Sequence, residues 1–415
     1  MTRTRVSMCP MKVVFLAPHY PPEMQQFTRG LAEVGAEVYG VGDQPPGALS
    51  PSLKPYLTDY LHVPHMMDED HVIGRVAQWL RGRSIDRVLA NWEPLVLCAA
   101  RLRERFGMPG MSVDTVRGFR DKELMKERVR AAGLRVPHSF RVRTVAEVHA
   151  AAETLGYPLI VKPIAGAGSA DTYKVEDRAH LDKVLVAMRH VHEASVEEYI
   201  DGEEFTFDTV SIDGVPSFVN VAQYLPKPII ARSTEWVSPV IITVRDLAQE
   251  KLQAGQALGR SVLKALGMGD GFTHMEWFLK PNGEAVFGEI GCRAPGAKLV
   301  DQMNYTHDID LFREWARVAV HGRFEGKIDP KFNTAIIFKR AKGHGKITRS
   351  EGVAEFMRAH GEHVVEQKLL PVGSHRRDWK QTLTSDGHIM LRHPEWDRAH
   401  ELAFMVATDI NLYAQ

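Results

Sequence analysis

Leu159-Ile160-Val161-Lys162-Pro163 is followed at once by Ile164-Ala165-Gly166-Ala167-Gly168-Ser169-Ala170-Asp171-Thr172. The apolar, β-branched run predicts a strand that carries Lys162, and the small residues after it predict a flexible turn. Glycines let backbone N–H groups approach a phosphate chain closely, and the lysine adds a positive charge. The stretch fits a cover over a nucleoside triphosphate, but it equally fits a β-hairpin with a solvated lysine.

The composition is that of an ordinary globular protein. Hydrophobic residues make up 44% of the 415 residues, and the 52 basic residues balance 52 acidic ones. The overall charge therefore gives no reason to expect nucleic acid or an anionic membrane as a partner. The sequence has no apolar leader and no run of 18 apolar residues, so we predict neither a signal peptide nor a membrane span. The cysteines Cys9, Cys98 and Cys292 have no CxxC spacing, which argues against structural zinc and favours a reducing cytoplasm.

Residues 1–112 are predicted to form a parallel-sheet domain. Lys12–Ala17 and Glu37–Val41 have the apolar character of buried strands, and Glu23–Val34 between them has a helical pattern. A strand, a helix and a strand in this order imply a parallel sheet with helices packed against it. No GxGxxG motif joins the first strand to its helix, which argues against a dinucleotide-binding oxidoreductase.

The middle of the chain changes to antiparallel sheet. A helical linker over residues 113–145 leads into it, and Glu204–Val210 alternates like a half-buried strand. Pro226–Pro239 is predicted to be a loop, and Leu247–Leu266 is predicted to be a long amphipathic helix. Toward the C-terminus we predict several strands and a final helix over Asp397–Leu412.

Two carboxylates mark a candidate metal site. Glu276 and Glu289 lie in two predicted strands joined by an Asn-Gly turn, which is a hairpin signal. Across such a hairpin the two side chains can face each other and share a divalent ion, and oxygen ligands suit Mg²⁺. Either glutamate alone would more often be a solvated strand residue. The pair favours a site, and Arg293 just beyond it could reach a phosphoryl group or a substrate carboxylate.

Other positions are weaker candidates. His274 is expected to point to the opposite face of its strand from Glu276 and to serve packing or hydrogen bonding. His19 and Glu93 follow predicted strands of the first domain, at the end where α/β sheets often bind ligands. A substrate could meet the loop that contains Arg232–Trp236, although loops carry charged residues in any case.

From about Lys12 to the C-terminus, the chain resembles the ATP-grasp superfamily and, within it, the carboxylate–amine or carboxylate–thiol ligase branch. The resemblance rests on an ordered series of short motifs, which are Phe119-Arg120-Asp121-Lys122, Val161-Lys162-Pro163, Gly166–Thr172, Val196-Glu197-Glu198-Tyr199-Ile200, Glu204, His274-Met275-Glu276 and Glu289-Ile290-Gly291-Cys292-Arg293. Each motif is weak alone, but their order and spacing together are specific. The cover interpretation of residues 159–172 is therefore favoured over the hairpin.

The resemblance implies a role for each matching residue. The cofactor-binding residues would be Lys122 and Lys162 at the phosphates, Gly166, Gly168 and Ser169 in the covering loop, and Glu204 at the ribose. Glu197, Glu198, Tyr199 and Ile200 would form the strand beside the adenine, which would be hydrogen-bonded by the backbone at Glu198 and Ile200. Glu276 and Glu289 would bind the metal, while Arg293 and Lys162 would serve catalysis. Many relatives have asparagine where this chain has Gly291, which puts the coordination of a second metal in doubt.

The resemblance also implies an architecture of the α/β and α+β classes, the ATP-grasp fold. A Rossmann-like domain (residues 1–112) would precede the ATP-grasp domain (113–325), and a C-terminal α+β region (326–415) would follow it. Within the ATP-grasp domain, a lid subdomain over about 139–200 would face a catalytic sheet over about 201–325. The implied cofactors are ATP and Mg²⁺, with Mn²⁺ as a substitute, and a homodimer is a further expectation.

The implied reaction joins a carboxylate to an amine. Attack of the carboxylate on ATP would give an acyl phosphate and ADP, and the amine would then displace phosphate. Two alternatives stay open: a carboxylase-like enzyme that activates bicarbonate, and a non-catalytic ATP-binding regulatory module. No Met-Lys-Met biotin-carrier motif occurs, and the intact lysines, glutamates and arginine argue against a non-catalytic module.

Overall fold

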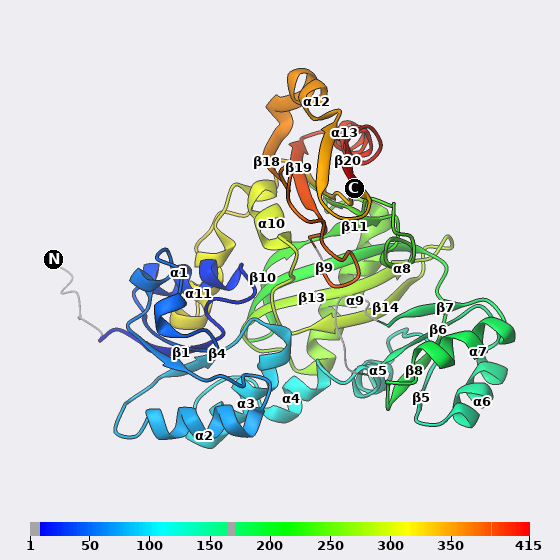
Figure 1. The fold of residues 1–415 in the computed structure, drawn as a ribbon. Helices are drawn as coiled ribbons and strands as arrows, with labels where there is room; N and C mark the ends of the chain where they lie inside the picture. The colour runs from blue at the N-terminus through cyan, green and yellow to red at the C-terminus, as the bar shows by residue number, and fades with distance from the viewer. Residues whose placement is uncertain (1–8, 165–170, 383) are drawn as a thin grey trace.

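The structure is a computed structural model, and it describes residues 9–164, 171–382 and 384–415. A central sheet separates the N-terminal elements, at the left of Figure 1, from a smaller sheet at the lower right, while the C-terminal elements lie at the top. Within the described ranges, no helix combines the length and the apolar character needed to cross a membrane.

The N-terminal elements form a parallel sheet, as predicted. They are β1 (Lys12–Leu16), α1 (Met24–Glu33), β2 (Glu37–Gly42), η1 (Pro46–Ala48), η2 (Lys54–Tyr56), β3 (Asp59–His62), α2 (Glu69–Trp79), β4 (Arg87–Leu89), η3 (Glu93–Leu95) and α3 (Val96–Phe106). The strand order is β3-β2-β1-β4, and the neighbouring strands are parallel. Strand β3 was not predicted, because its residues, Asp-Tyr-Leu-His, lack the apolar run of a buried strand.

A small antiparallel sheet follows and contains the strand of Lys162. The elements of this region are α4 (Val113–Gly118), α5 (Lys122–Ala131), β5 (Ser139–Val142), α6 (Val145–Leu155), β6 (Leu159–Pro163), β7 (Tyr173–Val175), α7 (Arg178–Ala187) and β8 (Ala194–Glu198). The strand order is β5-β8-β6-β7, and β6 confirms the predicted strand. The Asp121 carboxylate accepts hydrogen bonds from the backbone N–H groups of Glu123 and Leu124, which fixes the start of α5 and the place of Lys122.

The central sheet is antiparallel and carries the two candidate metal carboxylates. Its region contains β9 (Glu203–Ile212), β10 (Val215–Asn220), β11 (Ala222–Leu225), α8 (Pro228–Ser233), β12 (Val240–Thr243), α9 (Glu250–Leu266), β13 (Gly271–Leu279), β14 (Ala285–Gly291), α10 (Leu299–His307) and α11 (Leu311–His321). An added Cβ at Gly255 would lie 2.2 Å from Trp277, and one at Gly259 would lie 2.4 Å from Phe207. These glycines let α9 pack directly on the aromatic residues of β13 and β9.

The C-terminal residues extend the same sheet. The remaining elements are β15 (Asn333–Phe338), β16 (Lys342–Gly343), β17 (Ile347–Glu351), α12 (Val353–His360), η4 (Gly361–His363), β18 (Val364–Leu369), β19 (Gly387–His393), α13 (Trp396–Asp409) and β20 (Asn411–Ala414). The order of the large sheet is β14-β13-β9-β11-β12-β15-β19-β18, with β10 beside β9. The sheet therefore continues past residue 325, so the C-terminal region is not separate from it, and the proposed division into domains stays a prediction.

Three local predictions differ from the structure. The predicted loop Pro226–Pro239 contains α8, which begins with Pro228, a residue whose fixed φ angle suits the first helical position. Helix α10 was not predicted. The final helix ends at Asp409 rather than Leu412, and Asn411–Ala414 pairs with β17 as β20.

An apolar core joins the first sheet to the central sheet. Phe27 on α1 makes edge-on ring contacts with Phe312 and Trp315 on α11 and with Phe272 on β13, and all four residues are buried. Because this core spans both sheets, the loop that carries Glu93 is held in a fixed position relative to β14.

Candidate active site

One pocket between the small sheet and the central sheet collects most of the predicted site residues. Its lining includes Lys122, Lys162, Glu197, Glu198, Tyr199, Ile200, Glu204, Glu276 and Glu289. Lys227 and Ile229, which were not predicted, line it from the segment at the start of α8. Gly166, Gly168 and Ser169 of the predicted covering loop lie outside the described residues.

The two predicted metal carboxylates face each other. Glu276 on β13 is directly paired with Glu289 on β14, and the Tyr224 hydroxyl donates to Glu276 Oε1 over 3.2 Å. Glu289 Oε2 lies 3.2 Å from Lys122 Nζ and 3.7 Å from Lys162 Nζ. Burial alone would raise the pKa of Glu289, but the two lysines outweigh it and lower this pKa to about 2.

This donor set fits a hard cation that keeps several non-protein ligands. In the described part of the chain, no group of three or more His, Cys, Asp or Glu residues is arranged to hold a metal. Two facing carboxylates suit Mg²⁺, which usually binds one or two carboxylates together with water and substrate phosphates. At Gly291, an added Cβ would lie 3.1 Å from Glu93 Oε2. The missing side chain at this position leaves room for Glu93.

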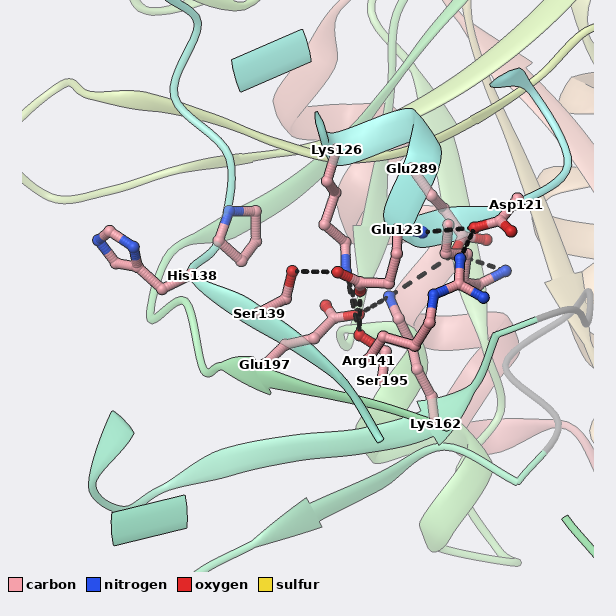
Figure 2. Close-up of polar contacts among 12 residues, drawn as sticks. Asp121, Glu123, Lys126, His138, Ser139, Arg141, Lys162, Ser195, Glu197 and Glu289 are labelled. Atoms are coloured by element: carbon pink, nitrogen blue, oxygen red, sulfur yellow. Dashed lines mark hydrogen bonds and ion pairs between the residues drawn. The ribbon is translucent and has the colours of Figure 1, made fainter. Parts of the chain in front are cut away.

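Glu197 belongs to a buried charge network, drawn in Figure 2. Its Oε1 lies 2.5 Å from Lys126 Nζ and 3.1 Å from Lys162 Nζ. Lys126 also pairs with Glu123 at 2.8 Å, and the Ser195 hydroxyl lies within hydrogen-bond distance of both carboxylates and can donate to either. The Glu197 carboxylate therefore faces lysines. The predicted contact of this segment with adenine would have to come from the backbone of the neighbouring residues. Sequence reasoning missed Lys126, although its spacing of four from Lys122 places both lysines on one face of α5.

Charge pairing determines the protonation states in this network. Burial alone would raise the pKa of Glu197, but Lys126 and Lys162 lower this pKa to about 2. Burial alone would lower the pKa of Lys162, but Glu197 and Glu289 hold it above its ordinary value. Near neutral pH the Lys162 ammonium is therefore charged and positioned between two carboxylates.

The other residues predicted to bind the nucleotide line the same pocket, and their side chains have different surroundings. Glu198 turns its carboxylate to Arg135, whose Nη2 lies 2.7 Å away. The Tyr199 ring has Lys174 Nζ 4.4 Å from its centroid, in a cation–π contact. Glu204 is only 7% exposed, and burial, followed by the nearby Glu276 charge, raises its pKa well above the ordinary value. A partner that donates hydrogen bonds, such as a hydroxyl, would suit this carboxyl group.

Arg293 lies in a smaller adjoining pocket. That pocket is lined by Glu93, Phe119, Arg120, Lys122, Met125, His274, Glu276, Glu289, Ile290, Gly291 and Arg293. It shares Lys122, Glu276 and Glu289 with the nucleotide-side pocket, so the two pockets meet at the paired carboxylates. Arg293 Nε donates to Glu93 Oε2 over 2.5 Å, and Arg120 donates to the other oxygen of Glu93.

The expectation that His274 points away from Glu276 was wrong, whereas the expected hydrogen-bonding role is present. Its Nε2 lies 3.7 Å from Glu276 Oε1, and its Nδ1 lies 2.6 Å from Asp208 Oδ1. Residues two apart on a strand share a face, so His274 and Glu276 point the same way. Burial alone would lower the pKa of His274, but Asp208 and Glu276 raise this pKa to about 9.

Of the other weak candidates, Glu93 lines the pocket of Arg293, whereas His19 and the Arg232–Trp236 segment lie elsewhere. His19 contacts Asp43 at 2.9 Å. Arg232 lies on α8 and donates to the backbone carbonyls of Trp379 and Lys380, and Glu235 pairs with Arg376. The Arg232–Trp236 segment thus makes these polar contacts with C-terminal residues.

The sequence of this region matches a known family. Residues 155–300 match the family model described as an ATP-grasp domain. Residues 155–300 are therefore identified as an ATP-grasp domain. The matched residues include Lys162, the Glu197–Ile200 segment, Glu204 and both facing carboxylates. ATP-grasp membership implies dependence on ATP and on a divalent metal.

Similar proteins extend the ATP-grasp likeness beyond these residues. The chain is 25% identical over 308 residues to an L-arginine-specific L-amino acid ligase of Bacillus subtilis, covering 72% of this chain and 73% of the relative. It is 25% identical over 274 residues to an alanine–anticapsin ligase of Bacillus subtilis strain 168, covering 61% and 57%. The crystal structure of an L-amino acid ligase from Bacillus licheniformis shares the fold, with a TM-score of 0.80, 21% identity and coverage of 99% and 100%.

Proposed function

We propose that this ATP-grasp protein is an ADP-forming ligase that activates a carboxylate as an acyl phosphate and couples it to an amine. The observation that carries the proposal is the meeting of two pockets at Glu276, Glu289 and Lys122. A nucleotide in one pocket and a carboxylate in the other would bring their reacting groups together at these residues.

The charges of the site support this arrangement. Lys122 and Lys162 approach Glu289 from the nucleotide side, where they would also contact the phosphates of bound ATP. Glu276 and Glu289 would hold Mg²⁺, or Mn²⁺ in its place. The metal would supply charge neutralisation of the triphosphate and orientation of its oxygens.

The first chemical step forms one bond and breaks another. A carboxylate oxygen of the substrate attacks the γ-phosphorus, the bond to the β,γ-bridging oxygen breaks, and ADP leaves with that electron pair. Arg293 and Lys162 stabilise the negative charge on the phosphoryl oxygens during transfer. The product of this step is an acyl phosphate.

The second step forms the amide. A neutral amine attacks the acyl carbon, the bond from carbon to the phosphate oxygen breaks, and inorganic phosphate leaves as the amine loses a proton. Water would hydrolyse the acyl phosphate, so the site has to exclude it while the amine attacks. The placement of the reacting region between two sheets supports such exclusion.

We further propose that both substrates are amino acids. The supporting observation is the pair of relatives named as an L-arginine-specific L-amino acid ligase and an alanine–anticapsin ligase. A likeness near 25% identity leaves the side-chain preference of each substrate open to experiment.

The test is a matrix of L-amino acid pairs with ATP and Mg²⁺, in which ADP and phosphate release are measured and the product mass is determined. The proposal expects at least one pair to stimulate both releases and to give a product lighter than the two substrates by one water. Stimulation by bicarbonate instead would favour the carboxylase-like alternative. ATP binding without turnover for any pair would favour a non-catalytic module.

A further inference from the structure

A separate pocket lies on the far side of the Gly291–Arg293 segment. Its volume is about 360 Å³, within the range of about 300–1,000 Å³ that is usual for small-molecule sites. Its lining comes from the end of β4, α3, the start of β13 and α11, and it shares no residue with the two active-site pockets. Its lining includes Asn91, Arg103, Asp213, Asp270, Cys292 and Ala319.

Asn91 places an unsatisfied donor at the buried part of this pocket. Asn91 is 4% exposed, and its Nδ2 has no hydrogen-bond partner among the described residues. Buried amide groups in folded proteins nearly always have a partner, so an unpaired one that lines a pocket indicates a site for an acceptor.

Arg103 adds a buried positive charge to the same lining. It is 9% exposed, and among the described residues it donates only to backbone carbonyls, those of Val88 at 3.0 Å and Met111 at 2.9 Å. Within the part of the chain that the structure describes, no carboxylate forms an ion pair with Arg103. Burial lowers the pKa of this guanidinium, and Cys292 and Glu104 only partly oppose that effect. Because arginine stays protonated in proteins, the buried charge calls for an anion.

The exposed part of the lining has the opposite charge. Asp213 and Asp270 both line the pocket and are solvent-exposed, and the backbone N–H of Asp213 donates to Asp270 over 2.7 Å. Phe272 and Trp315 add apolar lining to the pocket. The pocket thus offers donors and a positive charge inside and carboxylates outside.

We propose that this pocket is an effector site for a free amino acid. The carboxylate of the ligand would accept hydrogen bonds from Asn91 and Arg103, and its ammonium group would lie toward Asp213 and Asp270. This site is additional to the substrate sites of the proposed ligase, and its occupancy can be measured whether or not the ligase proposal holds.

Cys292 provides a direct connection to the active site. It lines the effector pocket, whereas the residues on both sides of it, Gly291 and Arg293, line the pocket of the reacting groups. A ligand against Cys292 therefore contacts the segment that carries Arg293. We expect occupancy to change kcat more than the KM for ATP, because Lys162 and Glu204 lie on other strands.

Two substitutions separate this site from the active site. Asn91→Leu removes the unpaired donor with little change in volume, and it should not lower thermal stability because no hydrogen bond is lost. Ala319→Phe fills the pocket from α11. Ala354→Phe on the exposed face of α12 is the matched control for the added ring, and Arg293→Leu reports binding in the active site.

The measurement is calorimetric titration without ATP, with L-alanine and L-glutamate as probes and with propionate and inorganic phosphate for comparison. We expect an amino acid to bind wild type, Ala354→Phe and Arg293→Leu alike, to bind Asn91→Leu about tenfold more weakly, and not to bind Ala319→Phe. Weaker binding of propionate than of L-alanine would support the contact with the aspartates. The proposal would be overturned if propionate and L-alanine bound equally well, if phosphate bound better than the amino acids, or if no probe bound. It would also be overturned if Ala319→Phe still bound the amino acid, or if only Arg293→Leu lost binding.

Discussion

Glu93 Oε2 lies 2.5 Å from Arg293 Nε, although 200 positions separate the two residues in the sequence. Glu93 follows β4 of the first sheet, and Arg293 follows β14 of the central sheet. Arg120 pairs with the same carboxylate. Burial alone would raise the pKa of Glu93, but the two arginines hold it below its ordinary value. A charged residue of the N-terminal region thus determines where the proposed catalytic arginine lies.

Glu93→Gln should lower kcat by about 10- to 100-fold, in the range found when a supporting partner is removed from a functional group. The amide cannot hold two guanidinium groups as a carboxylate does, so Arg293 would leave its position beside the paired carboxylates. The KM for ATP should change little, because Glu93 is absent from the lining of the nucleotide-side pocket. Steady-state ADP release measures both constants, and Glu127→Gln, on the exposed face of α5, is the control. An equal rise in the KM for ATP would contradict the positioning role.

The sequence was informative about the site wherever a motif is local. The strand that carries Lys162 and the facing of Glu276 and Glu289 follow from short patterns, because a hairpin aligns its own two strands. The contact of Glu93 with Arg293 depends on the packing of two sheets, which no local pattern records. The predicted direction of the His274 side chain was wrong for a different reason. Residues two apart on a strand share a face, so the alternation rule, applied correctly, already places His274 on the face of Glu276.

Glu197 should make stability depend on pH in the acid range. Its pKa is about 2 in the folded protein, against an ordinary value of 4.5. A lowered pKa means that the folded state favours the carboxylate, so the stabilisation is complete above about pH 4.5 and is lost as the pH falls toward 2. The loss amounts to about 3 kcal/mol. Urea unfolding at several pH values should show a shallower acid decline for Glu197→Gln than for wild type, and parallel curves would count against this assignment.

Lys126 should be essential for stability rather than only for activity. Its side chain is 1% exposed and lies between Glu123 and Glu197. Lys126→Met leaves buried carboxylates without one of their partners, which we expect to cost about 3–5 kcal/mol of unfolding free energy. Chemical denaturation measures the loss, and Lys183→Met on the exposed face of α7 should change it by no more than about 0.5 kcal/mol. Similar losses in the two variants would refute the role of the buried network.

Glu289→Gln should separate metal dependence from nucleotide binding. Without this carboxylate the proposed metal has only Glu276 as a charged protein ligand, so turnover should fall by about a thousandfold or more. Lys122 and Lys162 lose one carboxylate partner at the same time, and the substitution removes a negative charge near the triphosphate.

Metal-free ATP should therefore bind the Glu289→Gln variant at least as tightly as it binds wild type, while added Mg²⁺ should enhance binding only in wild type. Equilibrium titration of ATP with and without Mg²⁺ measures both effects. Glu284→Gln, in the turn of the same hairpin, should retain the Mg²⁺ response, since Glu284 pairs with Lys280 away from the pocket. An intact Mg²⁺ response in Glu289→Gln would show that the metal is bound elsewhere, because a single remaining carboxylate cannot reproduce the paired site.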